Sequence, residues 1–454
     1  MMRHLSSSAI FILLLLCSAL SLHASWWWPF GKSLPEQTPP EVPQTGKYIT
    51  PVVLDPSQTI HEKRSKEDPV SIERLEKLAQ NGNANAQLTL GKIYFDGAAG
   101  VKQDFKKAFR YFSEAAENGN PEAMYNVAIC YDGGFGVRQA SLEKCLELYR
   151  RAADAGVPEA QLKTAVFAEA QGHPEIAFQY YKLLADAGDV LCKFHLALFL
   201  LNGYGTAANP ELAVKYLREA AQAGNARAQI QLADCYRQGI GVSPDYQEVA
   251  SWLTLAAHEG DPEAQAKLGT CYERGIGVPK NYELAIHWYK ISAEANYSMG
   301  QYLLGNCYHD GIGTEQNYSL AFTNYSAAAE AGEALAQVAL ARAYQRGEGT
   351  VMDLNQAIRW LNRAAETGLP IAQARLGLLL FNGSEFIPAN PRRAQELLDA
   401  AVASNDSLAI IQIAICYLNG EGVAPDRDRA NALLQKAAAL GSLEARELLK
   451  SYFP

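Results

Sequence analysis

Small and apolar side chains recur through most of the chain with a period close to 36 residues. The segments Ala228–Tyr236, Ala264–Tyr272 and Gly300–Tyr308 all begin with a small residue, reach Leu four positions later and end in Cys-Tyr. The first residue of this pattern, which we call the anchor, recurs at Ala86, Ala123, Ala160, Cys192, Ala228, Ala264, Gly300, Ala336, Ala372, Ala409 and Ala445. Neighbouring anchors lie 36 or 37 residues apart, except for the 32 residues between Ala160 and Cys192. Such regularity indicates a tandem array of one supersecondary unit.

Each repeat has the pattern of two helices, which we call helix A and helix B. Helix A carries apolar or small residues at the anchor and four and eight positions later, which is one face of an α-helix. It ends at a Gly-x-Gly turn such as Gly275–Gly277, because glycine adopts the left-handed backbone that terminates a helix. Helix B begins after a residue whose side chain can accept the free N–H groups of the first turn. The predicted caps are Asp104, Ser141, Asn209, Asp245, Asn281, Asn317, Asp353, Asn390 and Asp426.

Two repeats depart from this pattern, and the two ends differ as well. The third repeat, at about 158–189, lacks the Gly-x-Gly turn and carries His173 at the cap position. The ninth replaces the turn by a longer loop from Gly383 to Pro388. Single helices are predicted at 71–81 and 442–451, where they would cover the exposed ends of the stack. The fold class predicted is therefore all-α, a right-handed solenoid of about ten helix pairs with a lone capping helix at each end.

The series A-Q-x-x-L-G-x-x-Y, G-x-G-V, D/N-x-x-x-A and A-A-x-x-G resembles the Sel1-like repeat family, a relative of the tetratricopeptide repeats. The resemblance covers 70–454. It implies a superhelical stack and a role in docking protein partners, as in envelope or polysaccharide-export machinery, signalling, host-cell contact or degradation complexes of the endoplasmic reticulum. The repeated residues are structural, so they indicate a fold more directly than a function.

The first 24 residues have the pattern of a signal peptide, with an apolar run from Ala9 to Leu20. Residues 25–69 are rich in proline and polar residues, which predicts a flexible linker. Two alternatives stay open: lipidation at Cys17, and retention of Ser8–Trp28 as an uncleaved membrane anchor with an interfacial tryptophan belt. We therefore expect an exported protein that is periplasmic, envelope-associated or secreted.

Charge and cysteine placement narrow the classes of function. The net charge is −9 and no Lys/Arg block occurs, so nucleic acid is not expected as a partner. Five of the seven cysteines after Cys17 occupy one repeat position, which places them further apart than a disulfide permits. Only Cys130 and Cys145, on the paired helices of one repeat, remain open as a bridge.

The histidines and the motif search give no sign of a catalytic or cofactor site. His173, His195, His258, His287 and His309 are scattered without metal-ligand spacing, and we interpret them as surface or capping residues. No Gly-x-Ser-x-Gly elbow or phosphate-binding loop occurs. No catalytic residue, metal or cofactor is therefore predicted.

One stripe of helix A varies from repeat to repeat while the core positions do not. It consists of the residues three, six and ten positions after each anchor, and we call it the helix A stripe. From the fifth repeat to the ninth it reads Gln231, Asp234, Gln238; Lys267, Thr270, Arg274; Leu303, Asn306, Asp310; Ala339, Arg342, Arg346; and Arg375, Leu378, Asn382. A superhelical stack turns this stripe toward its concave face. An ordinary solvated face explains the variation equally well.

The leading interpretation is an exported, monomeric scaffold that binds a peptide or protein partner on its concave face. The predicted partner-binding residues are Lys267, Arg274, Asp310, Arg342, Arg346 and Arg375. Two alternatives remain: a weak secreted β-lactam-binding or β-lactam-hydrolysing enzyme, which the resemblance to secreted relatives implies, and a purely structural envelope protein.

Overall fold

The computed structural model describes residues 72–98, 100–383, 388–420 and 423–453. These residues form 22 α-helices and no strand, so the predicted all-α solenoid of helix pairs is confirmed. The signal peptide, the linker, Cys17, Trp26–Trp28, Gly422 and most of the long loop of the ninth repeat lie outside the described residues. No helix among those described is both long and apolar enough to cross a membrane.

The helices fall into two compact units, with the boundary inside α11. The first unit contains α2 (Ile72–Gln80), α3 (Ala84–Asp96), α4 (Phe105–Glu117), α5 (Pro121–Gly133), α6 (Leu142–Asp154), α7 (Pro158–Ala170), α8 (Pro174–Asp186), α9 (Val190–Asn202) and α10 (Pro210–Gln222). The second contains most of α11 (Ala226–Gln238) and then α12 (Tyr246–His258), α13 (Pro262–Arg274), α14 (Tyr282–Glu294), α15 (Ser298–Asp310), α16 (Tyr318–Glu330), α17 (Ala334–Arg346), α18 (Leu354–Glu366), α19 (Pro370–Asn382), α20 (Pro391–Ala403), α21 (Ser407–Asn419), α22 (Arg427–Ala439) and α23 (Leu443–Tyr452).

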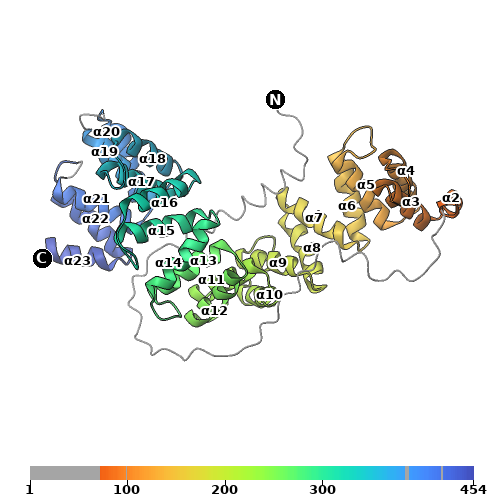
Figure 1. Cartoon of the computed structure of the whole chain (residues 1–454), viewed down its shortest axis with the longest axis horizontal. Helices are drawn as coiled ribbons and strands as arrows, with labels where there is room; N and C mark the ends of the chain where they lie inside the picture. The colour runs from red at the N-terminus through yellow and green to blue at the C-terminus, as the bar shows by residue number, and fades with distance from the viewer. Residues whose placement is uncertain (1–71, 99, 384–387, 421–422, 454) are drawn as a thin grey trace. The chain divides into compact units, whose positions relative to one another are not determined.

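Within each unit, consecutive helices pack side by side along the chain (Figure 1). Odd-numbered helices from α3 to α21 are the predicted helices A, and even-numbered helices from α4 to α22 are the predicted helices B. The first and last described helices, α2 and α23, lie where the single end helices were predicted.

The nine predicted caps of helix B are all confirmed. All nine predicted residues accept backbone N–H groups through their side chains; Oδ1 of Asp104, for example, lies 3.0 Å from the N atoms of Lys106 and Lys107. His173 occupies the same position before α8, where its side chain is exposed and makes no capping hydrogen bond, so it is a surface residue and not a cap. Its imidazole is no substitute for the short carboxylate, amide or hydroxyl group that reaches the first turn.

Small residues of helix A set its distance from helix B of the same repeat. A Cβ atom added at Gly269 would lie 2.6 Å from Cε1 of Tyr289, and one at Gly305 would lie 2.7 Å from Cδ1 of Tyr325. Both tyrosines belong to the largest fully buried side chains. The small residue five positions after the anchor therefore makes room for a buried aromatic ring, as the pattern indicates.

The seven cysteines that the structure describes are buried free thiols. Cys130 and Cys145 are among them, so the structure contains no bridge between these two residues. Burial raises the pKa of both thiols to about 12, which keeps them protonated and unreactive at neutral pH. They act as small apolar core residues.

The third repeat has the short connection that its sequence predicts. Only Gln171–His173 separate α7 from α8, whereas Gly275–Asn281 separate α13 from α14. The missing residues are those of the Gly-x-Gly turn.

Candidate binding surface

The helix A stripe of the second unit brings neighbouring repeats into contact. Nζ of Lys267, three positions after its anchor, lies 2.9 Å from Oδ2 of Asp234, six positions after the preceding anchor. The equivalent residues three repeats further on, one each on α17 and α19, are Arg342 and Arg375, whose positive charges act on one another. Position three of one repeat thus lies beside position six of the repeat before it, and side chains at these positions form pairs.

Asp234 and Lys267 are buried, and the positive charge of Lys267 is neutralised by carboxylates of the same unit. Lys267 is only 5% exposed, and its Nζ atom also lies 2.9 Å from Oε1 of Glu263. Burial raises the pKa of Asp234, and the charges of Lys267 and Arg237 oppose that rise. Lys267 was predicted to contact a partner, but here its charge holds two carboxylates of its own unit. Arg274, further along α13, is exposed.

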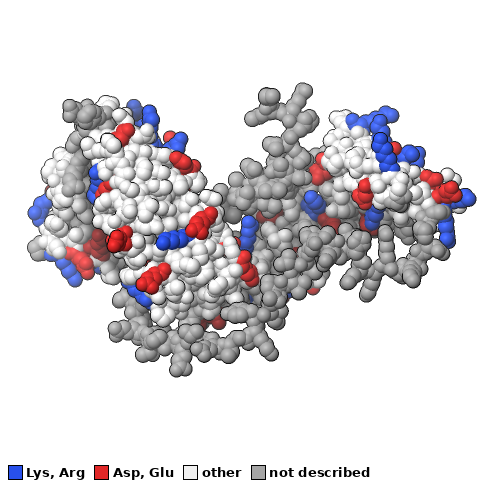
Figure 2. Space-filling model, viewed as in Figure 1, with Lys and Arg blue, Asp and Glu red and all other residues white. Residues whose placement is uncertain are grey.

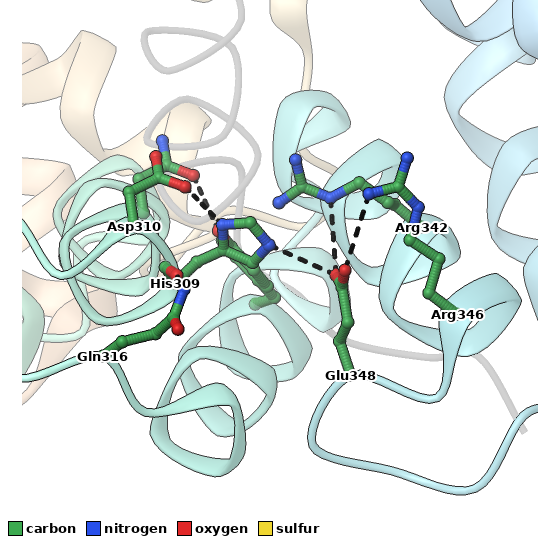
Figure 3. A network of polar contacts seen from close by, with 8 residues as sticks. His309, Asp310, Gln316, Arg342, Arg346 and Glu348 are labelled. Atoms are coloured by element: carbon green, nitrogen blue, oxygen red, sulfur yellow. Dashed lines mark hydrogen bonds and ion pairs between the residues drawn. The ribbon is translucent and has the colours of Figure 1, made fainter.

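A second network joins α15 to the turn after α17 (Figure 3). The Glu348 carboxylate points between the His309 ring and two guanidinium groups. Its Oε2 atom lies 3.2 Å from Nε2 of His309 and 3.8 Å from Nε of Arg342, and its Oε1 atom lies 3.6 Å from Nη1 of Arg346. Nδ1 of His309 contacts Oδ1 of Asp310. Glu348 therefore serves as the shared anion of one imidazole and two arginines.

Arg375 has a different environment from Arg342 and Arg346. It is partly buried on α19, and its Nε atom is fully buried without a hydrogen-bond partner among the described residues. Burial lowers its pKa, and the positive charges of Arg342 and Arg346 lower it further. Tyr302 and Cys416 are the groups that oppose this most, and both are neutral at pH 7. We call Arg342, Arg346 and Arg375 the arginine cluster.

Neutral polar groups lie next to the arginine cluster. The Tyr325 hydroxyl donates a hydrogen bond to Oδ1 of Asn306 at 2.8 Å, and the rings of Tyr302 and Tyr325 lie 6.1 Å apart. Burial raises the pKa of both tyrosines, while the charge of Arg342 lowers it. These hydroxyls stay neutral, so they supply no counter-charge to the arginines.

The structure brings four of the six predicted binding residues into one area: Asp310, Arg342, Arg346 and Arg375. It does not place Lys267 with them, because Lys267 belongs to the pair with Asp234. That any of the six binds a partner stays a prediction. Sequence reasoning missed Glu348 and His309. A signal existed for Glu348, because it stands between the two glycines of its turn where Ile276 and Ile312 stand in other repeats.

The interpretation of the histidines as surface or capping residues was wrong for two of them. The His309 side chain is 13% exposed and belongs to the Glu348 network. His195 stacks on Tyr181 with ring centroids 5.1 Å apart, and burial together with the charge of Arg227 lowers its pKa to about 4. Among the described residues, no group of three or more His, Cys, Asp or Glu side chains is placed to hold a metal ion.

Comparisons with known proteins agree with the helix-pair architecture. The Sel1 repeat model matches ten segments, at residues 84–120, 121–157, 169–189, 190–225, 226–261, 262–297, 298–333, 334–369, 370–406 and 407–442. A protective antigen of uropathogenic Escherichia coli strains with the SLR fold is 30% identical; the match covers 85% of this chain and 83% of that one, with a TM-score of 0.62. A Sel1 repeat protein from Oxalobacter formigenes is 28% identical over 70% of this chain and 95% of its own, with a TM-score of 0.57. No curated protein matches the sequence.

Proposed function

The chain belongs to the Sel1 repeat family, and from that premise we propose that it is an exported scaffold that binds a peptide or protein partner along the helix A stripe of its second unit. Solenoids of this family are typical protein–protein interaction scaffolds and are generally non-enzymatic. The proposal includes no catalytic activity, no cofactor and no nucleic-acid partner. Acidic and basic side chains are interspersed on the face drawn in Figure 2, which supports the last point.

One observation carries the proposal. The same two positions of the helix A stripe recur in each repeat, but the charges of the side chains at these positions differ between repeats. Asp234 with Lys267 is an ion pair, whereas Arg342 with Arg375 is a pair of like charges. The nine caps of helix B, which serve the fold, are all Asp, Asn or Ser. Side chains that change on a constant backbone frame are suited to recognising the successive residues of a bound chain.

Export is the second part of the proposal, and it rests on the signal-peptide pattern of residues 1–24 followed by the proline-rich segment 25–69. The similar protein from uropathogenic Escherichia coli strains is a protective antigen, which is compatible with an exported protein. We propose a periplasmic, envelope-associated or secreted monomer, with membrane attachment through the N-terminal segment as a variant of the same arrangement. Fractionation of cells with an antibody to the full chain tests this part.

Site-specific cross-linking tests partner binding directly. A photoreactive phenylalanine analogue replaces Arg346, whose side chain is 67% exposed in the stripe, and separately replaces Arg359, which is exposed on α18. We expect a discrete cross-linked adduct from position 346 that is absent from position 359. The adduct should also disappear when Arg274, Arg342 and Arg375 are changed to Ala. Equal labelling at the two positions, or no adduct at 346, would contradict partner binding at the stripe.

A further inference from the structure

We propose that Arg342 and Arg375 form a binding site for a carboxylate group of an acidic segment in the protein partner. This inference rests on the proposed function, because it names the chemistry that the helix A stripe recognises. It assigns the site to α17 and α19, which are the helices A of consecutive repeats.

Arg375 has no counter-ion among the residues that the structure describes. Its Nε atom is buried and makes no hydrogen bond among the described residues, and its strongest charged neighbours are the cations Arg342 and Arg346. A guanidinium group that is withdrawn from water without an anion is unfavourable for the fold. Such an arrangement is retained where a bound group supplies the missing charge.

Asp234 and Lys267 occupy the same two repeat positions as Arg342 and Arg375, and their opposite charges neutralise each other. Between Asp234 and Lys267, a carboxylate lies 2.9 Å from the ammonium group. The pair formed by Arg342 and Arg375 has a cation at both positions. A carboxylate bound between them would supply the anion that Asp234 supplies to Lys267.

The nearby acid Glu348 does not fill this role. Its two oxygens are shared between His309, Arg342 and Arg346, and its distance to Nε of Arg342 is 3.8 Å, which is too long for a hydrogen bond. Nε of Arg342 is likewise buried without a hydrogen-bond partner among the described residues. Two guanidinium groups therefore retain donor capacity at one place.

The geometry of the guanidinium groups and the neutral polar side chains around them favour a carboxylate as the bound group. Guanidinium is a planar fork that binds the two oxygens of a carboxylate together. Tyr302 and Asn306 border the site with neutral polar groups, and the Asn306 side chain is already oriented by its hydrogen bond from Tyr325. A peptide lying along the stripe would present an Asp or Glu side chain, or its C-terminal carboxylate, to this point.

The test selects ligands without assuming their sequence. The full chain is used as bait for a phage library of random 12-residue peptides, and enriched peptides are remade with a fluorescent label. We expect enriched peptides to contain Asp or Glu, or to bind only with a free C-terminus. Changing that acid to its amide should weaken binding at least about tenfold, as the loss of a central ion pair does.

Two variants of the protein decide the role of the cluster. Arg375→Glu places an acid beside Arg342, as Asp234 lies beside Lys267. Arg375→Leu introduces the residue that Leu303 supplies at the same repeat position. Both should lose binding of the acidic peptide while the midpoint of thermal unfolding stays equal or rises. Arg359→Glu, with the same charge change at an exposed position of α18, should bind within about twofold of the parent.

The outcomes separate this inference from the proposed function. If enriched peptides bind the stripe but carry no required acid, or bind Arg375→Glu as tightly as the parent, the carboxylate site is wrong and the scaffold function stands. If the library yields no peptide above background, and cross-linking at position 346 also fails, both are wrong. A large fall in the unfolding midpoint of both Arg375 variants would overturn the inference, because it would show that Arg375 serves the fold.

Discussion

The carboxylate of Glu348 lies 3.2 Å from Nε2 of His309, although 39 residues separate them in the chain. The contact links α15 to the turn that ends α17, so it connects one repeat to the next on the side of the helix A stripe. Because Arg342 and Arg346 lie at the same carboxylate, the network also sets the position of two arginines of the cluster.

Replacing Glu348 by Ala should lower the free energy of unfolding by about 1–3 kcal/mol, because three donors lose one partly buried anion. Glu348 is 15% exposed on its side chain, so solvent replaces it only in part. Urea denaturation of the full chain measures the change. The matched control is Glu396→Ala, which removes an acid from an exposed ion pair with Arg392 and should cost less than about 0.5 kcal/mol. Equal losses in the two variants would contradict the structural role of Glu348.

Gly269→Ala should destabilise the second unit by about 1–3 kcal/mol, because the added methyl group meets the Tyr289 ring. Ala233, at the same repeat position, packs in a repeat where Leu253 replaces the tyrosine. The methyl group should therefore cost less in a Tyr289→Leu background. A double-mutant cycle by urea denaturation measures this coupling. A cost of Gly269→Ala that does not depend on residue 289 would show that the close contact is not its cause.

Local interactions were the part of the fold that the sequence alone could predict. The nine caps of helix B were identified because a capping bond joins residues two or three positions apart, so its donor and acceptor are both visible in the sequence. Helix pairing followed from a repeat spacing that stays nearly constant. The third repeat was recognised as short for the same reason.

Contacts between repeats could not be read in this way, and most of the candidate site consists of such contacts. Lys267 looked like a free basic residue of the stripe, but Asp234 lies 33 residues earlier and neutralises it. His309 contacts Glu348, which lies 39 residues later in the chain, so the residues next to His309 in the sequence do not reveal its partner. The pairing of position six with position three of the next repeat, as between Asp234 and Lys267, could be seen only in the structure.

The stability of the first unit should fall in acid because of His195. Its pKa of about 4 in the folded chain lies below the usual value of 6.5, so the unfolded chain binds the proton more tightly. This contribution is fully present above about pH 6.5 and is lost as the pH falls toward 4, with a total of about 3 kcal/mol. His195→Phe, which keeps a ring against Tyr181, should flatten the dependence of the free energy of unfolding on pH in that window. His258→Phe, at an exposed position of α12, should leave it unchanged, and a parent curve without a slope between pH 4 and 6.5 would contradict the assignment.

His173→Asn should raise the free energy of unfolding of the first unit, because it introduces a capping side chain where the chain has none. His173 precedes Pro174 at the start of α8 and makes no side-chain capping bond. Asn209 precedes Pro210 in the same arrangement at the start of α10, and its Oδ1 atom accepts from the N atom of Leu212 at 3.0 Å. His173 is exposed, so the change removes no core contact. The expected gain is about 0.5–1 kcal/mol in urea denaturation, with Asp353→Ala as the opposite control at a loss of about 1 kcal/mol. If His173→Asn were neutral while Asp353→Ala destabilised, the short connection between α7 and α8 would be holding residue 173 in a backbone conformation that no side chain can use for capping.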